Sequence, residues 1–289
     1  MYAGIGVVWG CSFLFIKEGL GFLTPTGVAF VRNALGALTL LGVARARGQR
    51  LPREPVVLAH LAVVSLLINS VPSVLFALAE THATTVLAGI INGMTPLTSL
   101  FFIAVVFRDE PIRRHQVMGL VVGLVGIVLV LGAWRGFGRS PWWAVASLVL
   151  AVTLYGVSFP YTRRYLTPRG LDALGAVPVQ LSFAALCLAP AFIVHGWHSA
   201  APRPNQILSM LALGALGSGL AFLWNYRVIE RAGAAVASTV TYLTPVVAVI
   251  VGVSILHEAV LWNQPLGGAV VLLGAAIAQG RLRLTRRGP

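Results

Sequence analysis

The chain has 289 residues, of which 57% are hydrophobic and only 10% are charged. A soluble domain of this length could not bury so much apolar surface, whereas a protein embedded in a bilayer requires it. A net charge of +13 would indicate nucleic-acid binding in a soluble protein, but basic loops between membrane spans explain it here, so we expect no nucleic-acid partner.

The chain contains ten apolar segments, each close to the ~20 residues that cross a hydrocarbon core ~30 Å thick. Short links with turn residues separate them, for example Leu23-Thr24-Pro25. The sequence therefore predicts an all-α polytopic membrane protein with ten transmembrane helices. The predicted spans are Tyr2–Leu20, Thr26–Ala44, Val56–Leu78, Thr84–Phe107, Gln116–Trp134, Trp142–Tyr161, Asp172–Val194, Gln206–Ile229, Ala234–Leu256 and Asn263–Leu282.

Basic residues alternate between the predicted loops. Of the 21 lysines and arginines, 16 fall in every second loop and the C-terminal tail, four fall in the other loops, and Arg32 lies within a span. Because cytoplasmic loops carry the excess of lysine and arginine, this bias predicts that both termini are cytoplasmic. It also supports ten spans, since one missed span would destroy the alternation.

One pattern of unlike residue types occurs twice. A Thr-Pro pair inside an apolar run is followed by a glutamate, a glutamine and three glycines, and from the glutamate onward the two copies are 148 positions apart. We interpret this as an internal duplication. The copies are Thr95-Pro96, Glu110, Gln116, Gly119, Gly126 and Gly132, and Thr244-Pro245, Glu258, Gln264, Gly267, Gly274 and Gly280.

The duplication predicts two five-helix repeats, residues 1–134 and 142–282, with a linker at 135–141 and a basic cytoplasmic tail at 283–289. Trp9-Gly10-Cys11-Ser12-Phe13 in the first span is echoed by Tyr155-Gly156-Val157-Ser158-Phe159 in the sixth. Because five is an odd number, the second repeat enters the membrane from the opposite side. Inverted-topology repeats are typical of secondary transporters.

Arg32 is the clearest ionisable residue within a predicted span, where a charge costs about 2.5–3.5 kcal/mol and therefore suggests function. Lys17 and Glu18, near the outer end of the first span, are predicted to form a charged cluster with it. Arg32 either faces a cavity, where it binds a substrate carboxylate or holds a gate, or it pairs with Glu18 or caps helix ends. All eight acidic residues fall at or near span ends, which argues against proton coupling through a central carboxylate. Glu110 and Glu258 are predicted to stabilise the N-termini of the fifth and tenth spans.

Pro96 and Pro245 lie in the middle of the fourth and ninth predicted spans. Proline removes a backbone hydrogen bond and kinks a helix, and the carbonyl that it frees can face a cavity. We predict that both prolines act as hinges or line a cavity; a kink that serves only packing is the alternative. The neighbouring cavity candidates are Asn92 and Thr95 in one half, and Thr241, Tyr242 and Thr244 in the other.

Other polar and aromatic residues within spans could line the same cavity or form hydrogen bonds between helices. No metal site, catalytic motif or nucleotide-binding loop is recognisable, and His195 with His198 lacks a third ligand nearby, so we expect neither enzyme activity nor a cofactor. The further candidates are Trp9, Ser12 and Asn69 in the first half, and Tyr155, Ser158, Trp224 and Asn225 in the second.

The chain resembles the drug/metabolite transporter superfamily, specifically the ten-span EamA type. Two groups of residues carry the resemblance over nearly the whole chain. At Gln180 the second half lacks an arginine that would echo Arg32. The matching residues are Trp9, Gly10, Ser12, Phe13, Lys17, Pro25 and Arg32, and the repeat pattern Pro96, Glu110, Gln116, Gly119, Gly126 with Pro245, Glu258, Gln264, Gly267, Gly274.

The resemblance implies a bacterial inner-membrane exporter of amino-acid-like or drug-like metabolites that works by alternating access around a central cavity. A nucleoside or sugar-nucleotide carrier of the same fold, a passive channel and a membrane scaffold remain alternatives. The substrate, a coupling proton or ion, and the choice between monomer and dimer are left open.

Overall fold

The structure is a computed structural model that describes residues 2–107, 114–131, 140–198 and 201–278. Within these ranges the secondary structure is helical, apart from one isolated β-bridge between Leu23 and Trp197. Glu110, Gly132, Gly280, linker residues 135–139 and the tail 283–289 lie outside the described ranges.

Seven helical stretches in the described part of the chain are long and apolar enough to cross a membrane. They are Pro25–Ala46, Pro55–Glu80, Thr85–Phe107, Trp142–Arg169, Ala173–His195, Pro204–Ala232 and Ala234–Ser254. Three shorter helices overlap the remaining predicted spans: α1 (Tyr2–Gly19), α7 (Arg114–Leu131) and α14 (Asn263–Ala278).

The first half of the chain forms a series of helices whose starts have clear local causes. The Thr24 side chain accepts a hydrogen bond from Gly27 N, and the Thr84 side chain accepts one from Leu87 N; each oxygen satisfies an otherwise unpaired amide at a helix start. The helices after α1 are α2 (Pro25–Ala46), α3 (Pro55–Val64), the π-helix η1 (Ser65–Ser70), α4 (Val71–Glu80), α5 (Thr85–Asn92), α6 (Thr95–Phe102), the π-helix η2 (Ile103–Phe107) and α7.

The second half follows a similar order. Asp172 begins α9, because its side chain accepts a hydrogen bond from Leu174 N. The helices are α8 (Trp142–Tyr165), the 3₁₀-helix η4 (Thr167–Arg169), α9 (Ala173–His195), α10 (Pro204–Ala212), the π-helix η5 (Leu213–Leu220), α11 (Ala221–Ala232), α12 (Ala234–Ser238), the 3₁₀-helix η6 (Thr239–Tyr242), α13 (Leu243–Ser254) and α14.

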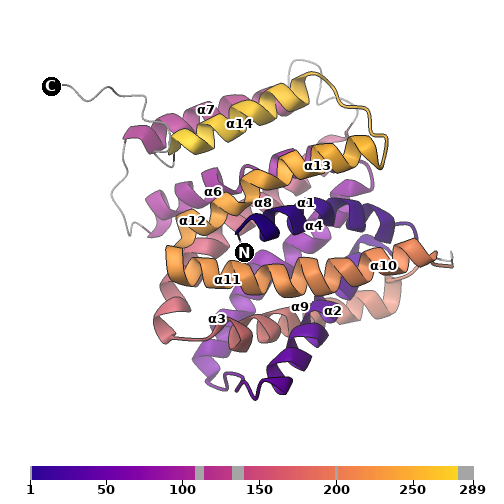
Figure 1. The fold of residues 1–289 in the computed structure, drawn as a ribbon, viewed down its shortest axis with the longest axis vertical. Helices are drawn as coiled ribbons and strands as arrows, with labels where there is room; N and C mark the ends of the chain where they lie inside the picture. The colour runs from indigo at the N-terminus through magenta and orange to yellow at the C-terminus, as the bar shows by residue number, and fades with distance from the viewer. Residues whose placement is uncertain (1, 108–113, 132–139, 199–200, 279–289) are drawn as a thin grey trace.

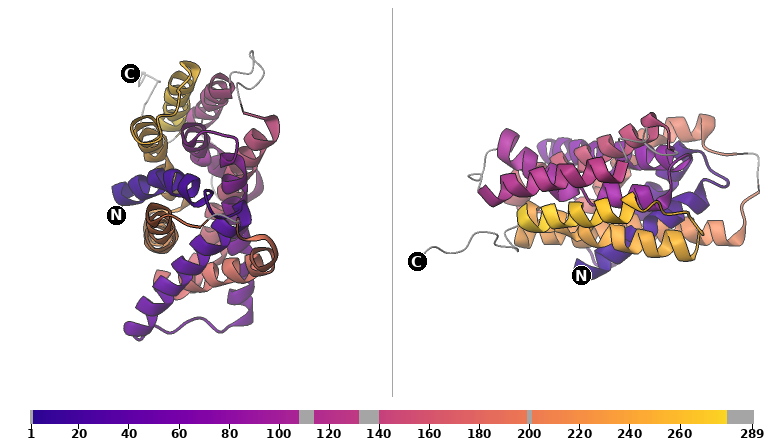
Figure 2. Two further views of the ribbon diagram at one scale, coloured as in Figure 1. Left: turned by 90° about the vertical axis from the view of Figure 1, so that its right-hand side faces the viewer. Right: turned by 90° about the horizontal axis from the view of Figure 1, so that it is seen from above.

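Helices from the two halves are interleaved, and most run side by side across Figure 1. α7 packs on α14 in the pair at the top of that view, and α2 packs on α9. Four further contacts form two pairs that relate one half to the other. In the first pair α1 packs on α13 and α8 packs on α6; in the second α2 packs on η5 and α9 packs on η1. Figure 2 shows the same bundle end-on and from above.

The repeated glycines explain the close pairing of α7 and α14. A Cβ added to Gly126, Gly267 or Gly274 would lie less than 3.0 Å from a backbone nitrogen of the opposite helix. Small residues at such positions let membrane helices approach closely. In lipid the hydrophobic effect does not drive helices together, so van der Waals packing at such contacts stabilises the pair. These glycines of the repeated pattern therefore serve packing.

Two irregular features interrupt the helices at corresponding places, and the sequence analysis did not predict the first of them. The π-helices η1 and η5 begin at Ser65 and Leu213, which are 148 positions apart like the repeat itself. Both helices that contain a Thr-Pro pair are also irregular near it. In the first half the α-helix stops at Gly93 between α5 and α6, and in the second half the helix tightens to 3₁₀ geometry in η6. The predicted single helices Thr84–Phe107 and Ala234–Leu256 are thus each broken.

Polarity is arranged as a bilayer requires. Large apolar side chains such as Ile193 (79% exposed) and Leu186 (69%) face outward, while Asn33, Asn69 and Glu80 are fully buried. In hydrocarbon, polar groups must be satisfied inside the protein, so the interior of the bundle can be the more polar region.

Candidate functional site

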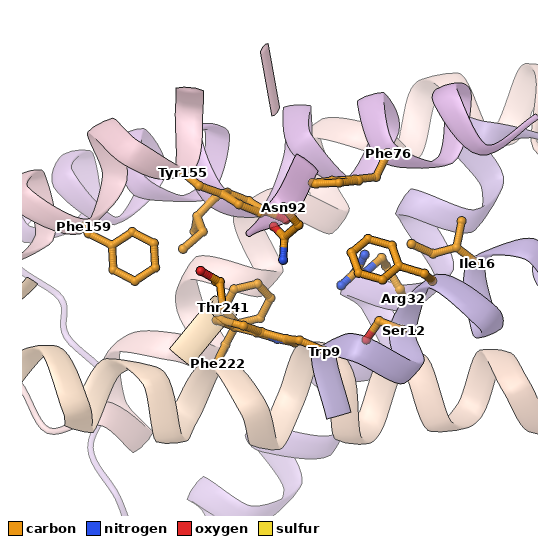
Figure 3. Close-up of a pocket in the computed structure, with 12 residues that line it drawn as sticks. Trp9, Ser12, Ile16, Arg32, Phe76, Asn92, Tyr155, Phe159, Phe222 and Thr241 are labelled. Atoms are coloured by element: carbon orange, nitrogen blue, oxygen red, sulfur yellow. The ribbon is translucent and has the colours of Figure 1, made fainter. Parts of the chain in front are cut away.

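A cavity lies between helices of both halves. Its empty volume is about 470 Å³, including the solvent-filled space at its open side. Figure 3 shows its lining side chains pointing toward a common space. α1, α2, η1, α4 and α5 contribute from the first half, and α8, α11 and η6 from the second. The lining residues are Trp9, Ser12, Phe13, Ile16, Arg32, Ile68, Phe76, Asn92, Tyr155, Phe159, Phe222 and Thr241.

Aromatic rings form most of the wall of this central cavity. The Trp9 and Phe222 rings meet edge to face with centroids 5.4 Å apart, and Phe76 stacks on Tyr155 at 5.7 Å. Phe13 packs against Phe76, also at 5.7 Å. Such pairs hold rigid apolar surfaces and present ring faces that accept an apolar or aromatic body.

Arg32 is the cationic residue among these lining side chains. It is 5% exposed, and its Nε donates a hydrogen bond to Ser218 Oγ at 3.0 Å. Its electrostatic neighbours are Tyr155 and Glu80. A guanidinium offers five N–H donors in a planar fork, so one bond to Ser218 leaves donors for a carboxylate ligand.

The residues of the predicted charged cluster take separate partners. Glu18 accepts a hydrogen bond from Asn205 Nδ2 at 2.7 Å and not from Arg32. Lys17 Nζ donates to the main-chain oxygen of Glu80 at 2.8 Å. In this conformation Arg32 therefore does not pair with Glu18.

The two Thr-Pro regions meet beside the cavity. Asn92 Nδ2 donates a hydrogen bond to Thr244 Oγ1 at 3.1 Å, and this bond joins the two halves of the chain. Thr95 Oγ1 donates to Asn92 O at 2.7 Å, and Thr244 Oγ1 donates to Thr241 O at 2.6 Å. At each helix break a threonine hydroxyl therefore hydrogen-bonds to a main-chain carbonyl oxygen.

Both prolines are buried within the protein, as a hinge or cavity-lining role requires. Pro96 lies in the first turn of α6, and the ring of Pro245 lies against Gly93, where an added Cβ would be 2.8 Å from Pro245 Cγ. Neither residue is among those that line the central cavity.

Several sequence candidates lie outside the central cavity. Ser158 Oγ donates to Tyr155 O at 2.8 Å, within its own helix. Trp224 packs on α1, where an added Cβ on Gly4 would meet its ring at 2.9 Å. Tyr242 packs against the hydrophobic core, and Asn69 accepts a hydrogen bond from Gln180 Nε2.

Asn225 lines a second pocket with about 250 Å³ of empty space. Two of its lining residues, Ile68 and Phe222, also line the central cavity, so the two spaces adjoin. Asn225 Oδ1 and Tyr226 OH are buried without a hydrogen-bond partner among the described residues. The pocket is lined by Val64, Ile68, Thr162, Val177, Gln180, Phe222, Asn225, Tyr226 and Ile229.

Sequence reasoning missed the apolar members of the cavity wall: Phe13, Ile16, Ile68, Phe76, Phe159 and Phe222. In a chain that is 57% hydrophobic, an apolar side chain by itself does not distinguish a cavity from a lipid-facing surface. One signal was available: Phe13 and Phe159 end the matching five-residue patterns of the first and sixth spans.

The predicted role of Glu258 needs a correction. The helix that follows it, α14, begins only at Asn263. Its carboxylate instead accepts hydrogen bonds from Thr85 N at 2.8 Å and Val86 N at 3.0 Å, so it caps α5 in the other half of the chain.

Comparison with known proteins agrees with this architecture. The model of the EamA-like transporter family matches residues 1–132 and again residues 142–279. A solved crystal structure has the same fold, with a TM-score of 0.71 at 23% sequence identity over 97% of this chain and 95% of the other.

Curated relatives cover most of the chain as well. The uncharacterized inner membrane transporter YedA of Escherichia coli K12 is 26% identical over 94% of this chain and 87% of its own length. A probable terminal-alkyne amino-acid exporter of Streptantibioticus cattleyicolor is 27% identical over 97% and 93%. The aromatic amino acid exporter YddG of Ancylobacter novellus is 28% identical over 66% of each chain. With its apolar helices and its twofold family match, the chain is an integral membrane protein that belongs to the EamA-like transporter family.

Proposed function

We propose that this protein is a secondary transporter that exports a small carboxylate-bearing metabolite, amino-acid-like in size, by alternating access in a bacterial inner membrane. One observation carries the proposal: an aromatic cavity built from both halves of the chain holds a buried arginine with hydrogen-bond donors to spare. The aromatic walls pack against the apolar body of the solute, and the Arg32 guanidinium donates hydrogen bonds to its carboxylate.

The proposal includes ten spans in two inverted repeats, residues 1–134 and 142–282, with both termini in the cytoplasm. The paired helix contacts support the repeats, because α1 relates to α13 as α8 relates to α6. The matching positions of η1 and η5 support them too. The alternation of basic residues along the sequence supports the orientation.

The charge of the central cavity favours one class of solute over the alternatives. Most sugar nucleotides carry a diphosphate with two negative charges, whereas Arg32 is the one cation among the described lining residues. Two relatives are named as amino-acid exporters, which agrees with a solute that has one carboxylate. We therefore favour amino-acid-like solutes.

Counterflow in proteoliposomes tests the function directly. Vesicles are loaded with an unlabelled aromatic or aliphatic amino acid, and entry of the same labelled compound is followed. We expect solute on the far side to accelerate entry, as in a carrier, and we expect the matched amide, which lacks the carboxylate, to be ineffective. Equal entry into loaded and empty vesicles would indicate a channel and contradict the proposal.

A pair of arginine variants tests the assigned site. Arg32→Gln should abolish counterflow of carboxylate solutes, because the cavity loses its cation. Arg47→Gln is the matched control, since Arg47 is exposed at the opposite end of the same helix. If Arg32→Gln folds and transports at the wild-type rate, the carboxylate site is elsewhere.

A further inference from the structure

Glu80 is a buried carboxylate that the proposed solute site does not use. It is the last residue of α4, and the sequence analysis placed it at a span end. The structure buries it completely, at 0% exposure. It lies one helical turn after Phe76, which lines the central cavity.

The carboxylate of Glu80 has no hydrogen-bond partner among the described residues, at either oxygen. The hydroxyl of Thr85 interacts with it outside hydrogen-bond geometry and is itself unpartnered. Lys17, the one lysine in the sequence, donates instead to the main-chain oxygen of Glu80 at 2.8 Å. The side chain is thus enclosed but not paired.

Charged and titratable groups lie near Glu80 on several of the elements around α4. Lys17 on α1 and Arg32 on α2 attract a negative charge there, and Glu258 repels it. The Glu258 carboxylate accepts hydrogen bonds from the two amides that begin α5. α8 brings Tyr155 against Phe76, and His82 just beyond α4 is exposed and bonded to Thr81. The segment η1 has no titratable side chain.

An anionic carboxylate in such a place is costly, because it has lost its water and accepts no hydrogen bond of normal geometry from the described residues, although Lys17 and Arg32 attract it. A protonated carboxyl group is neutral and avoids most of this cost. Ionisable groups inside membrane proteins that face the protein interior commonly lie on ion pathways or proton relays.

Resting on the transport function proposed above, we propose that Glu80 is the binding site for a coupling proton, occupied in this conformation and emptied in the opposite one. When the other side opens, the O–H bond of Glu80 breaks, the electron pair stays on the carboxylate, and the proton passes to water. The resulting anion is then stabilised by Lys17 or Arg32, which already lie nearby. Because Arg32 also lines the solute cavity, it connects proton release to solute binding.

Two assays on the full chain in proteoliposomes test this site. For the wild type, we expect a pH gradient across the vesicle membrane to accelerate solute movement in one direction, and the reversed gradient to slow it. Glu80→Gln should lose this response but keep counterflow, because exchange needs no net proton movement. Glu80→Asp keeps an acid and should retain the response, and Glu258→Gln should also retain it.

Infrared spectroscopy gives a readout that a structural role would not produce. We expect the C=O stretch of a protonated carboxyl group in the wild type and its loss in Glu80→Gln. Absence of this band, or a Glu80→Gln variant with the wild-type response to the gradient, would overturn the proton site. If counterflow is present in the wild type but no pH gradient affects it, the proton proposal fails and the transport function stands.

Discussion

Arg32 Nε donates a hydrogen bond to Ser218 Oγ at 3.0 Å and so joins α2 of the first half to η5 of the second. The corresponding place in the other half has a neutral bond, from Gln180 Nε2 to Asn69 Oδ1, between α9 and η1. Gln180 lies 148 positions after Arg32. Gln180 therefore corresponds to Arg32 in position, as the sequence indicated, but carries no charge.

The Arg32–Ser218 bond leads to the first prediction. Ser218→Ala removes the acceptor and should reduce stability by about 0.6 kcal/mol, the mean for hydrogen bonds between membrane helices, and by at most about 1.7 kcal/mol. If the bond also positions the guanidinium, affinity for a carboxylate solute should fall by about 3- to 15-fold, since about 1.4 kcal/mol is tenfold. Thermal unfolding with and without solute measures both effects.

Ser147→Ala is the control for this variant, because the Ser147 hydroxyl donates to Trp143 O inside its own helix. It should leave solute affinity unchanged. Wild-type affinity in Ser218→Ala would mean that the bond holds helices together without orienting Arg32.

The second prediction concerns Asn92 and Thr244, whose side chains connect the two broken helices. A double-mutant cycle with Asn92→Ala and Thr244→Val should give a coupling energy of about 0.6 kcal/mol, and at most about 1.7 kcal/mol. Unfolding free energies of the four proteins in detergent provide the cycle. Thr244→Ser keeps the hydroxyl and should retain the coupling, whereas additive single effects would show that the bond does not contribute.

The sequence predicted those features that local patterns determine. Apolar length predicted the seven long spans. The repeated glycines indicated a duplication, and the structure places them at the close contact between α7 and α14. The polar candidates Trp9, Ser12, Arg32, Asn92, Tyr155 and Thr241 do line one cavity.

The features that the sequence did not predict depend on contacts between distant parts of the chain. Glu258 caps a helix that begins 173 residues earlier, and no local motif encodes that pairing. The depth of Glu80 along its helix could be estimated, but its burial depends on which helices cover it. The π-helices η1 and η5 occupy matching positions in the two halves, but no local sequence pattern predicted them.

The third prediction tests the close contact at the first helix break. An added Cβ on Gly93 would lie 2.8 Å from Pro245 Cγ, in a rigid ring that cannot turn away. Gly93→Ala should therefore destabilise the protein by about 1–3 kcal/mol, the usual cost of overpacking. Gly42→Ala on α2 is the control, because nothing lies within 4 Å of its added Cβ. Helix propensity predicts that this control is neutral or more stable by up to ~1 kcal/mol. Similar melting temperatures for both variants would contradict the contact.

The fourth prediction concerns the cap that Glu258 provides across the two halves. Its two oxygens accept hydrogen bonds from Thr85 N and Val86 N, which are the first amides of α5. Glu258→Ala leaves both donors unpaired and removes a negative charge from a helix N-terminus, so it should cost about 1–2 kcal/mol of stability.

Glu54→Ala is the matched control for this cap. Glu54 stands at the N-cap of α3, but its side chain makes no capping hydrogen bond. Its removal should change stability by no more than ~0.5 kcal/mol, as for other surface substitutions. Thermal unfolding of the two variants compares a carboxylate that caps with one that does not. Because the Glu258 cap holds α5 against the segment before α14, its loss should also raise hydrogen exchange at the first amides of α5. Unchanged exchange there in Glu258→Ala would show that the cap is dispensable.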